Sequence, residues 1–293
     1  ILKRVEPKDT VIFDITHGLR SIPFLAFIFA AFLKSAREVT IEAIYYGAFE
    51  LGNRETGKPA PVIELSEFIS MFDWLSAVNE FLSTGSARYL AEQLSKRGLP
   101  ALQPVAGNVE EISQGLELLR PREVAKASQE ISHHLKSAAD ALPRPFGVVA
   151  NPLETAYGRF GLPPDANIRE HLRVQLRMIN WYFEKKQFVH TLSMAREWLV
   201  SLLCVEFGQD VWDKDQRGEM EFLLSGGVRK EDGVVIKQSP HLDKWKQLQY
   251  CKRLNRLWSG KPYELANLRN DVLHSGFRKN SQPAADIVDQ VKR

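Results

Sequence analysis

Three polar side chains near the carboxyl end of the sequence have types and a spacing suited to phosphodiester chemistry. Arg269 and Asn270 are neighbours, and His274 follows four residues after Asn270. Residues four apart lie one turn above each other on a helix, and the long arginine side chain can reach the same place. A fixed cation, an amide and an imidazole at one helix end can hold a phosphodiester and move its protons. We therefore predict that these three residues are catalytic.

The element that must position them is predicted to be one short helix over residues 262–277. Pro262 suits a helix start, and Gly276 suits a left-handed stop just past the end. The alternative is a solvated helix face with a capping histidine, because the helix dipole favours a positive side chain in the last turn. The apolar face of the predicted helix has four members at helical spacing: Leu265, Leu268, Val272 and Leu273.

A second polar cluster follows a predicted buried strand near the start of the sequence. The apolar run 11–13 leads into residues 14–18, Asp-Ile-Thr-His-Gly, and then into an apolar helix over residues 24–33. A strand, a small polar turn and a helix form the arrangement in which backbone N–H groups meet an anion. Gly18 permits close approach of the backbone, Thr16 and Ser21 supply hydroxyls, and Arg20 supplies a guanidinium fork. These residues are candidate ligand contacts.

Residues 39–47 are predicted to form a second strand, because they are rich in β-branched and aromatic side chains. A strand, helix and strand of this length form a right-handed unit, so Tyr46 and Gly47 are predicted to flank the 16–18 turn. Tyr46 is a candidate for stacking on a base, with a core tyrosine as the alternative. Residues 62–65 are predicted to add a short strand before a helix that Ser66 caps.

The two motifs together resemble a known class of CRISPR-associated proteins. The segment Asp14–Gly18 resembles the signature of the DxTHG family, and Arg269-Asn270-x-x-x-His274 resembles the R-x4-H signature of HEPN ribonucleases. The two occur in this order in type III accessory ribonucleases of antiviral defence, in which a CARF sensor domain precedes a HEPN domain. The resemblance covers most of the chain, but only the two motifs are specific.

The expected fold is α/β followed by all-α. Residues 1–66 are expected to be the C-terminal part of a CARF-like, Rossmann-like parallel sheet, whose N-terminal half is expected to be missing because the motif lies so close to Ile1. Residues 67–142 are expected to be a helical connector and residues 143–293 a HEPN helical bundle. Helices are predicted over 67–98 with a break at 84–86, 109–119, 122–142, 168–188, 191–207 and 241–257. A Pro- and Gly-rich connector is predicted over 143–164, and a β-hairpin or loop over 226–239.

The chemistry expected at the Arg-Asn-His helix is metal-independent cleavage of single-stranded RNA by the RNA's own 2′-hydroxyl. His274 would shuttle protons, Arg269 would neutralise the phosphorane charge, and Asn270 would position the phosphate or the histidine. One histidine is short of both an acid and a base, so a homodimer or a higher even-numbered homo-oligomer is expected to supply the second set. Glu197 is a candidate for orienting Arg269 or His274, with a buried structural ion pair as the alternative.

The resemblance also implies an allosteric activator, a cyclic oligoadenylate at a two-fold CARF interface, with cyclic tetra-adenylate the expected ring. No other cofactor and no metal site are expected. Two alternatives stay open, a non-enzymatic cyclic-oligoadenylate sensor or scaffold and a ring nuclease that degrades the activator. The residues expected to contact the activator come from the two strand ends: Thr16, His17, Gly18, Arg20, Ser21, Tyr46 and Gly47.

Composition indicates a soluble cytoplasmic protein without a membrane partner. Cys204 and Cys251 are the two cysteines and are expected to be free core thiols in a reducing compartment. No signal peptide is expected, and the longest apolar run, residues 22–33, is too short to span a bilayer. The formal net charge of +3 is too small to indicate nucleic-acid binding by itself. A basic stripe over residues 169–177 is either a contact for RNA phosphates or a solvated helix face.

Overall fold

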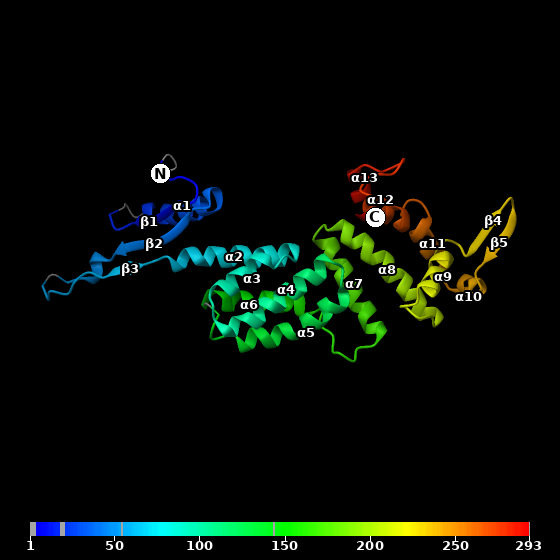
Figure 1. The fold of residues 1–293 in the computed structure, drawn as a ribbon, viewed down its shortest axis with the longest axis horizontal. Helices are drawn as coiled ribbons and strands as arrows, with labels where there is room; N and C mark the ends of the chain where they lie inside the picture. Colours follow the sequence, from blue (N-terminus) through cyan, green and yellow to red (C-terminus); the bar gives the residue numbers. More distant parts are fainter. Residues whose placement is uncertain (1–3, 18–20, 54, 143, 293) are drawn as a thin grey trace.

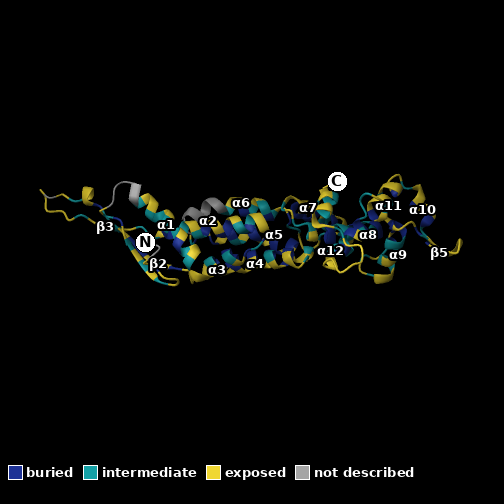
Figure 2. Cartoon of the chain, turned by 90° about the horizontal axis from the view of Figure 1, so that it is seen from above, coloured by how far each residue is buried: buried dark blue, intermediate teal, exposed yellow. Residues whose placement is uncertain are grey.

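The molecule is elongated, with a small α/β block at one end, a row of helices in the middle, and further helices with a hairpin at the other end (Figure 1). The computed structural model describes residues 4–17, 21–53, 55–142 and 144–292. Figure 2 shows the buried residues concentrated along the helices, while the hairpin at one end and the loop before β3 at the other are exposed.

The α/β block contains a three-stranded mixed sheet in the order β1-β2-β3. Strand β1 (Thr10–Asp14) pairs in parallel with β2 (Thr40–Gly47), and helix α1 (Ser21–Arg37) connects them. The predicted strand-helix-strand unit is therefore confirmed. Strand β3 (Val62–Glu64) pairs antiparallel with β2, because the chain turns back after a short 3-10 helix, η1 (Phe49–Leu51). The sheet is accordingly mixed, where an all-parallel sheet was expected.

Helix α1 covers one face of this sheet. Its Ala30 packs in a small core with Ile15 and Ile44. Ile12 and Tyr45 alternate with these residues along the strands and are 54% and 38% exposed. The outer side of α1 is also apolar and open, and a cavity of about 390 Å³ lies between α1 and α2. The seven residues that line it are all apolar: Phe24, Phe27, Leu65, Phe68, Met71, Phe72 and Leu75.

Six helices form the central block and share one hydrophobic core. Its aromatic centre includes Phe81 of α2, Tyr157 of α6 and Trp181 of α7, and the Phe81 and Tyr157 rings stack with their centroids 4.1 Å apart. A second 3-10 helix, η2 (Pro100–Leu102), precedes α4. The six helices are α2 (Glu67–Thr84), α3 (Arg88–Lys96), α4 (Gln103–Glu117), α5 (Pro121–Ser137), α6 (Arg144–Gly158) and α7 (Ile168–Glu184).

The predicted connector over residues 143–164 is wrong, because most of it is helix α6. Pro152 lies inside this helix. An interior proline costs about 3 kcal/mol. The helix also buries Leu153 and Tyr157 completely, and each such side chain contributes roughly 1.5–3 kcal/mol. The free energy gained by this burial therefore offsets the cost of the proline. Helix α6 packs into the same core as α2 and α5, so the domain boundary expected between residues 142 and 143 falls inside that core.

The C-terminal block has a second core, built around α8. The predicted hairpin is confirmed, with Asp232 and Gly233 at its turn in left-handed backbone conformations. The predicted helix over 241–257 is two helices, because the backbone is extended at Leu248. The elements are α8 (Phe188–Phe207), α9 (Lys214–Leu224), β4 (Val228–Glu231), β5 (Val234–Gln238), α10 (Leu242–Gln247), α11 (Cys251–Ser259), α12 (Leu265–Leu273) and α13 (Ala284–Lys292).

Helix α8 joins the two cores. Met194 belongs to the core of the central block, whereas Leu192 and Leu199 belong to the C-terminal core. Of the described helices, α8 alone is long and apolar enough to cross a membrane, and 44% of that window is buried in the protein. A core helix of a soluble protein has the same properties, so α8 is consistent with a soluble protein. The two cysteines, Cys204 and Cys251, are free and buried as predicted, and burial raises the pKa of both thiols.

Candidate active site

Helix α12 positions the Arg-Asn-His residues and begins later than predicted. It starts at Leu265, because Glu264 has a left-handed backbone (φ 46°) that a right-handed helix excludes, so Pro262 lies before the helix. Its inner face packs against α8 and α11 through Leu265 and Leu268, which are buried. Leu273 was predicted to share this face but is 46% exposed. The apolar face is therefore narrower than the sequence pattern indicated.

Arg269 and Asn270 lie together on the half-buried side of α12. The Arg269 guanidinium donates a hydrogen bond from Nη1 to Oδ1 of Asn270 at 3.2 Å. Its Nε is buried and has no hydrogen-bond partner among the described residues. In the part of the chain that the structure describes, no carboxylate forms an ion pair with this guanidinium. Arg269 therefore presents a cation that is held by an amide and is not neutralised within the described chain.

His274 is the C-cap residue of α12 and is exposed. Its backbone N–H donates to the Asn270 carbonyl at 3.0 Å, which places the two residues one turn apart as predicted. The chain then turns sharply, because Ser275 and Gly276 both have left-handed backbones, and Phe277 N–H donates to the His274 carbonyl at 2.9 Å. The predicted left-handed stop at Gly276 is confirmed. The three residues therefore lie on the second half of one short helix, where Arg269 and Asn270 are in side-chain contact and the exposed His274 follows one turn after Asn270.

Asp271 is a residue of this site that the sequence analysis did not single out. It is 5% exposed, and its Oδ2 accepts the backbone N–H of Gln282 at 2.9 Å. Its other oxygen, Oδ1, is buried without a partner among the described residues. The available signal was a carboxylate at an apolar helix position, three residues after Leu268. Asp271 ties the segment that follows His274 back onto α12.

Glu197 does not contact the Arg-Asn-His residues in this structure. Its carboxylate pairs with Arg196 and, at 2.7 Å, with Arg217 of α9. Arg196 also pairs with Glu221 at 2.7 Å. The alternative of a structural ion pair is therefore the observed one, although the Glu197 side chain is 48% exposed and not buried.

The amino-terminal motif forms a turn that joins the ends of β1 and β2. Thr16 donates its backbone N–H to Asp14 Oδ1 at 2.9 Å, and its Oγ1 accepts the Gly47 N–H at 2.8 Å. A Cβ at Gly47 would lie 2.9 Å from Thr16 Cγ2, so only glycine fits there without a shift. The Thr16 hydrogen bonds hold the pKa of Asp14 below its usual value. The predicted neighbours Thr16 and Gly47 are thus in direct contact.

The other candidate ligand contacts at this edge differ in their exposure and in whether the structure describes them. His17 is exposed, and its ring lies 5.8 Å from the Phe49 ring between centroids. Tyr46 packs against the small core, and its hydroxyl donates to Glu50, which raises the pKa of Tyr46 and lowers that of Glu50. The ring is thus partly a core residue, as the alternative proposed. Gly18 and Arg20, and the side chain of Ser21, lie outside the described residues.

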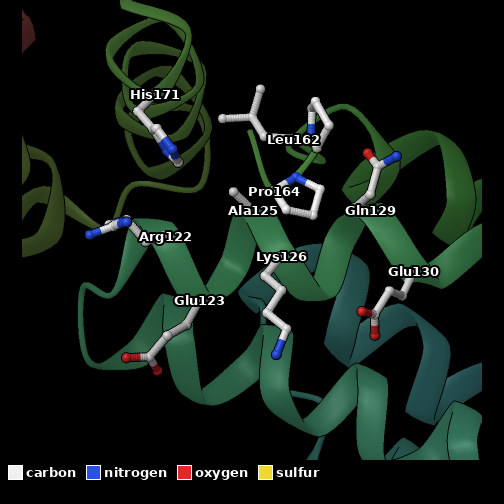
Figure 3. Close-up of a pocket in the computed structure, with 10 residues that line it drawn as sticks. Arg122, Glu123, Ala125, Lys126, Gln129, Glu130, Leu162, Pro164 and His171 are labelled. Carbon is white, nitrogen blue, oxygen red and sulfur yellow. The ribbon is translucent and has the colours of Figure 1, made fainter. Parts of the chain in front are cut away.

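A separate pocket of about 400 Å³ lies between α5, the loop before α7, and α7 itself, and contains no residue of either motif (Figure 3). Burial and the nearby Arg122 cation lower the pKa of His171. Glu123 and Glu130 share the rim with Arg122, so the pocket has mixed charge. Within the described chain, no group of three or more His, Cys, Asp or Glu side chains is arranged to hold a metal ion.

The predicted basic stripe is on the surface of α7. Its three arginines are all exposed, and none has an ion-pair partner in the described ranges: Arg169, Arg173 and Arg177. The stripe is therefore a solvated helix face in the chain without RNA. Its contact with RNA phosphates stays a prediction.

Comparison with known proteins identifies a relative of the central block. Residues 70–162 match the family model of the second domain of CRISPR-associated protein MJ1674. CRISPR-associated protein MJ1674 of Methanocaldococcus jannaschii is 27% identical over 117 residues, which are 40% of this chain and 18% of that relative. The family-model match includes neither the 14–18 motif nor the 269–274 motif. The similarity supports a CRISPR-associated protein with a CRISPR-related role.

Proposed function

We propose that this protein is a CRISPR-associated endoribonuclease that cleaves single-stranded RNA without a metal ion and is activated by a cyclic oligoadenylate. The observation that carries the proposal is the state of Arg269. Its guanidinium is held by Asn270 and has no carboxylate partner in the described chain, and the exposed His274 ends the same helix. A guanidinium in this state is available to bind a phosphodiester. Its hydrogen bonds to the charged phosphate oxygens are stronger than its hydrogen bonds to water.

The proposed reaction assigns one role to each side chain. The RNA 2′-hydroxyl attacks the adjacent phosphorus, the bond to the 5′ oxygen breaks, and a 2′,3′-cyclic phosphate remains. His274 moves a proton, Arg269 stabilises the charge that develops on the phosphoryl oxygens, and Asn270 fixes the guanidinium. Because attack needs a base and departure needs an acid, a second copy of the chain supplies the other imidazole across a two-fold axis.

The proposed activator site is the β1–β2 edge. Parallel strands end there, and in open α/β sheets ligands bind outside the carboxyl ends of the strands. Thr16 and Gly47 bring the two strand ends into contact at 2.8 Å, and the exposed His17 ring stands beside Phe49. A cyclic oligoadenylate offers phosphates for the backbone N–H groups of such a turn and bases for the aromatic rings. The ring is proposed to be cyclic tetra-adenylate.

The test is RNA cleavage in the presence of a chelator, with and without cyclic tetra-adenylate, by the wild-type protein and two histidine variants. His274→Ala is expected to lose activator-dependent cleavage by at least about a hundredfold, the low end of the effect of removing an acid–base group. His171→Ala serves as the matched control, since His171 belongs to neither motif and should leave cleavage unchanged.

The outcomes separate the alternatives. Cleavage that survives His274→Ala would refute the proposed mechanism. Tight binding of the oligoadenylate without any RNA cleavage would indicate a non-enzymatic sensor or scaffold. Degradation of the oligoadenylate itself, lost in His17→Ala and retained in His274→Ala, would indicate a ring nuclease.

A further inference from the structure

Phe277 is more exposed than any other large apolar side chain that the structure describes, at 93% of its surface. Its backbone is nevertheless fixed. The Phe277 N–H donates to the His274 carbonyl at 2.9 Å, across two residues with left-handed backbones. A four-residue turn of this kind keeps its first and last Cα atoms within about 7 Å. The turn therefore holds the backbone of this open aromatic residue close to that of the candidate catalytic histidine.

The residues that follow the ring are cations. Arg278 and Lys279 are exposed, and neither has an ion-pair partner among the described residues. The Arg278 guanidinium donates to the Asn267 carbonyl at 3.4 Å. This cation therefore lies against α12, near the residue two positions before Arg269. An exposed ring flanked by unpaired cations is the combination that binds single-stranded nucleic acid, in which bases stack on the ring and phosphates meet the cations.

We propose that Phe277 is the stacking platform for an unpaired nucleobase of the RNA next to the phosphate that is cleaved, with Arg278 and Lys279 on the flanking phosphates. The inference rests on the proposed function and adds the residue that recognises the single strand, because a base that is paired in a duplex cannot offer its face to a side chain. The site thus selects single-stranded over double-stranded RNA at the cleavage point.

A second copy of this chain is a weaker candidate for covering Phe277. A two-fold contact that buried the ring itself would bring the Arg278 and Lys279 of both copies together, whereas the proposed dimer only has to place the two His274 imidazoles at one RNA phosphate, with the ring left open beside them. Like charges brought together at an interface oppose association, whereas the phosphates of an RNA strand attract them. The charges next to the ring therefore favour RNA.

The test uses binding, so that it does not depend on cleavage. Phe277→Leu, Phe277→Ala and Phe277→Trp are made in the His274→Ala protein, and the affinity for a fluorescent single-stranded RNA is measured by anisotropy. The Leu and Ala variants are expected to bind about tenfold more weakly, and the Trp variant to bind like the parent, because only Trp keeps a π-face. Affinity for a duplex of the same sequence is expected not to change. Phe183→Leu, a partly exposed aromatic on α7, is the matched control.

The cations are tested by salt dependence. Lys279→Gln is expected to lower the slope of log affinity against log salt by about one, as for the loss of one phosphate contact. Equal RNA affinity of Phe277→Leu and the His274→Ala parent would overturn the inference. So would a failure of the parent and of every Phe277 variant to bind RNA. So would a loss of dimer mass in Phe277→Ala that is restored in Phe277→Leu, because that result would assign the ring to a second copy. A stacking effect in a protein that does not cleave RNA would retain the platform and refute only the nuclease.

Discussion

At the scale of single residues, the role proposed for Arg269 requires a planar guanidinium, and a positive charge alone would not fulfil it. Arg269→Lys keeps the charge but loses the planar fork that bonds Asn270 and that we propose also binds the phosphate. We expect the rate of RNA cleavage to fall at least about tenfold, because preorganised stabilisation of the transition state is lost. The free energy of unfolding should stay within about 0.5 kcal/mol. Single-turnover cleavage and urea unfolding measure the two effects, with Arg88→Lys on the exposed surface of α3 as a control. An unchanged rate would show that the fork has no role.

Asp14 is the residue at which pH is expected to act on the amino-terminal turn. Hydrogen bonds from Thr16 lower its pKa in the folded state. The stabilisation from this carboxylate is therefore fully present above the pKa of an unfolded Asp, about 3.9, and is lost as pH falls through the lower folded value. Thr16→Val removes the hydroxyl, so we expect the pKa of Asp14 to move up toward its ordinary value. A carboxyl-detected NMR titration of both proteins measures it, and an unchanged Asp14 pKa would contradict the assignment.

At the scale of elements, the end of α2 shows how tightly the central core is packed. Gly85 has a left-handed backbone (φ 83°), and a Cβ there would lie 2.7 Å from the Trp181 ring. Gly98 has a similar backbone (φ 63°) but open space around it. We expect Gly98→Ala to cost about 1–2 kcal/mol from the backbone alone, and Gly85→Ala about 1–3 kcal/mol more from overpacking. Denaturant unfolding of the pair measures the difference, and equal losses would show that Trp181 shifts freely.

The sequence predicted the elements whose signals are local. The β1-α1-β2 unit, the Asp232-Gly233 hairpin turn and the Gly276 stop each depend on a few adjacent residues. Elements that depend on distant contacts were missed. Helix α6 persists through Pro152 because Leu153 and Tyr157 fill a core made by other helices.

The candidate site shows the same division. The spacing of Arg269, Asn270 and His274 placed them at one helix end, since that requires only helical periodicity. Besides the adjacent Arg196, Glu197 pairs with Arg217, twenty residues away on α9, and no periodicity indicates that second pair. The role of Asp271 in holding the segment at Gln282 likewise depends on a chain reversal after α12. Ion pairs and hydrogen bonds between residues far apart in the sequence are therefore what the sequence pattern could not predict.

At the scale of the whole molecule, the continuous helix α8 determines how heat should unfold the chain. Met194 on α8 is packed in the central core, and Leu203 on the same helix is packed in the C-terminal core. Neither core can lose its structure without uncovering one side of a helix that the other core still needs. The two blocks are therefore expected to melt as one cooperative unit, although each has its own hydrophobic centre.

Scanning calorimetry can measure this coupling. Met194→Ala and Leu203→Ala, each expected to cost about 2–5 kcal/mol, should both lower the temperature of one shared heat-absorption peak. Two peaks, of which each substitution moves only one, would instead make the blocks thermally independent. With shared melting, damage to the central block would also remove the Arg269–His274 end at the same temperature, so loss of the proposed RNA cleavage on heating would report on the whole helical part of the chain.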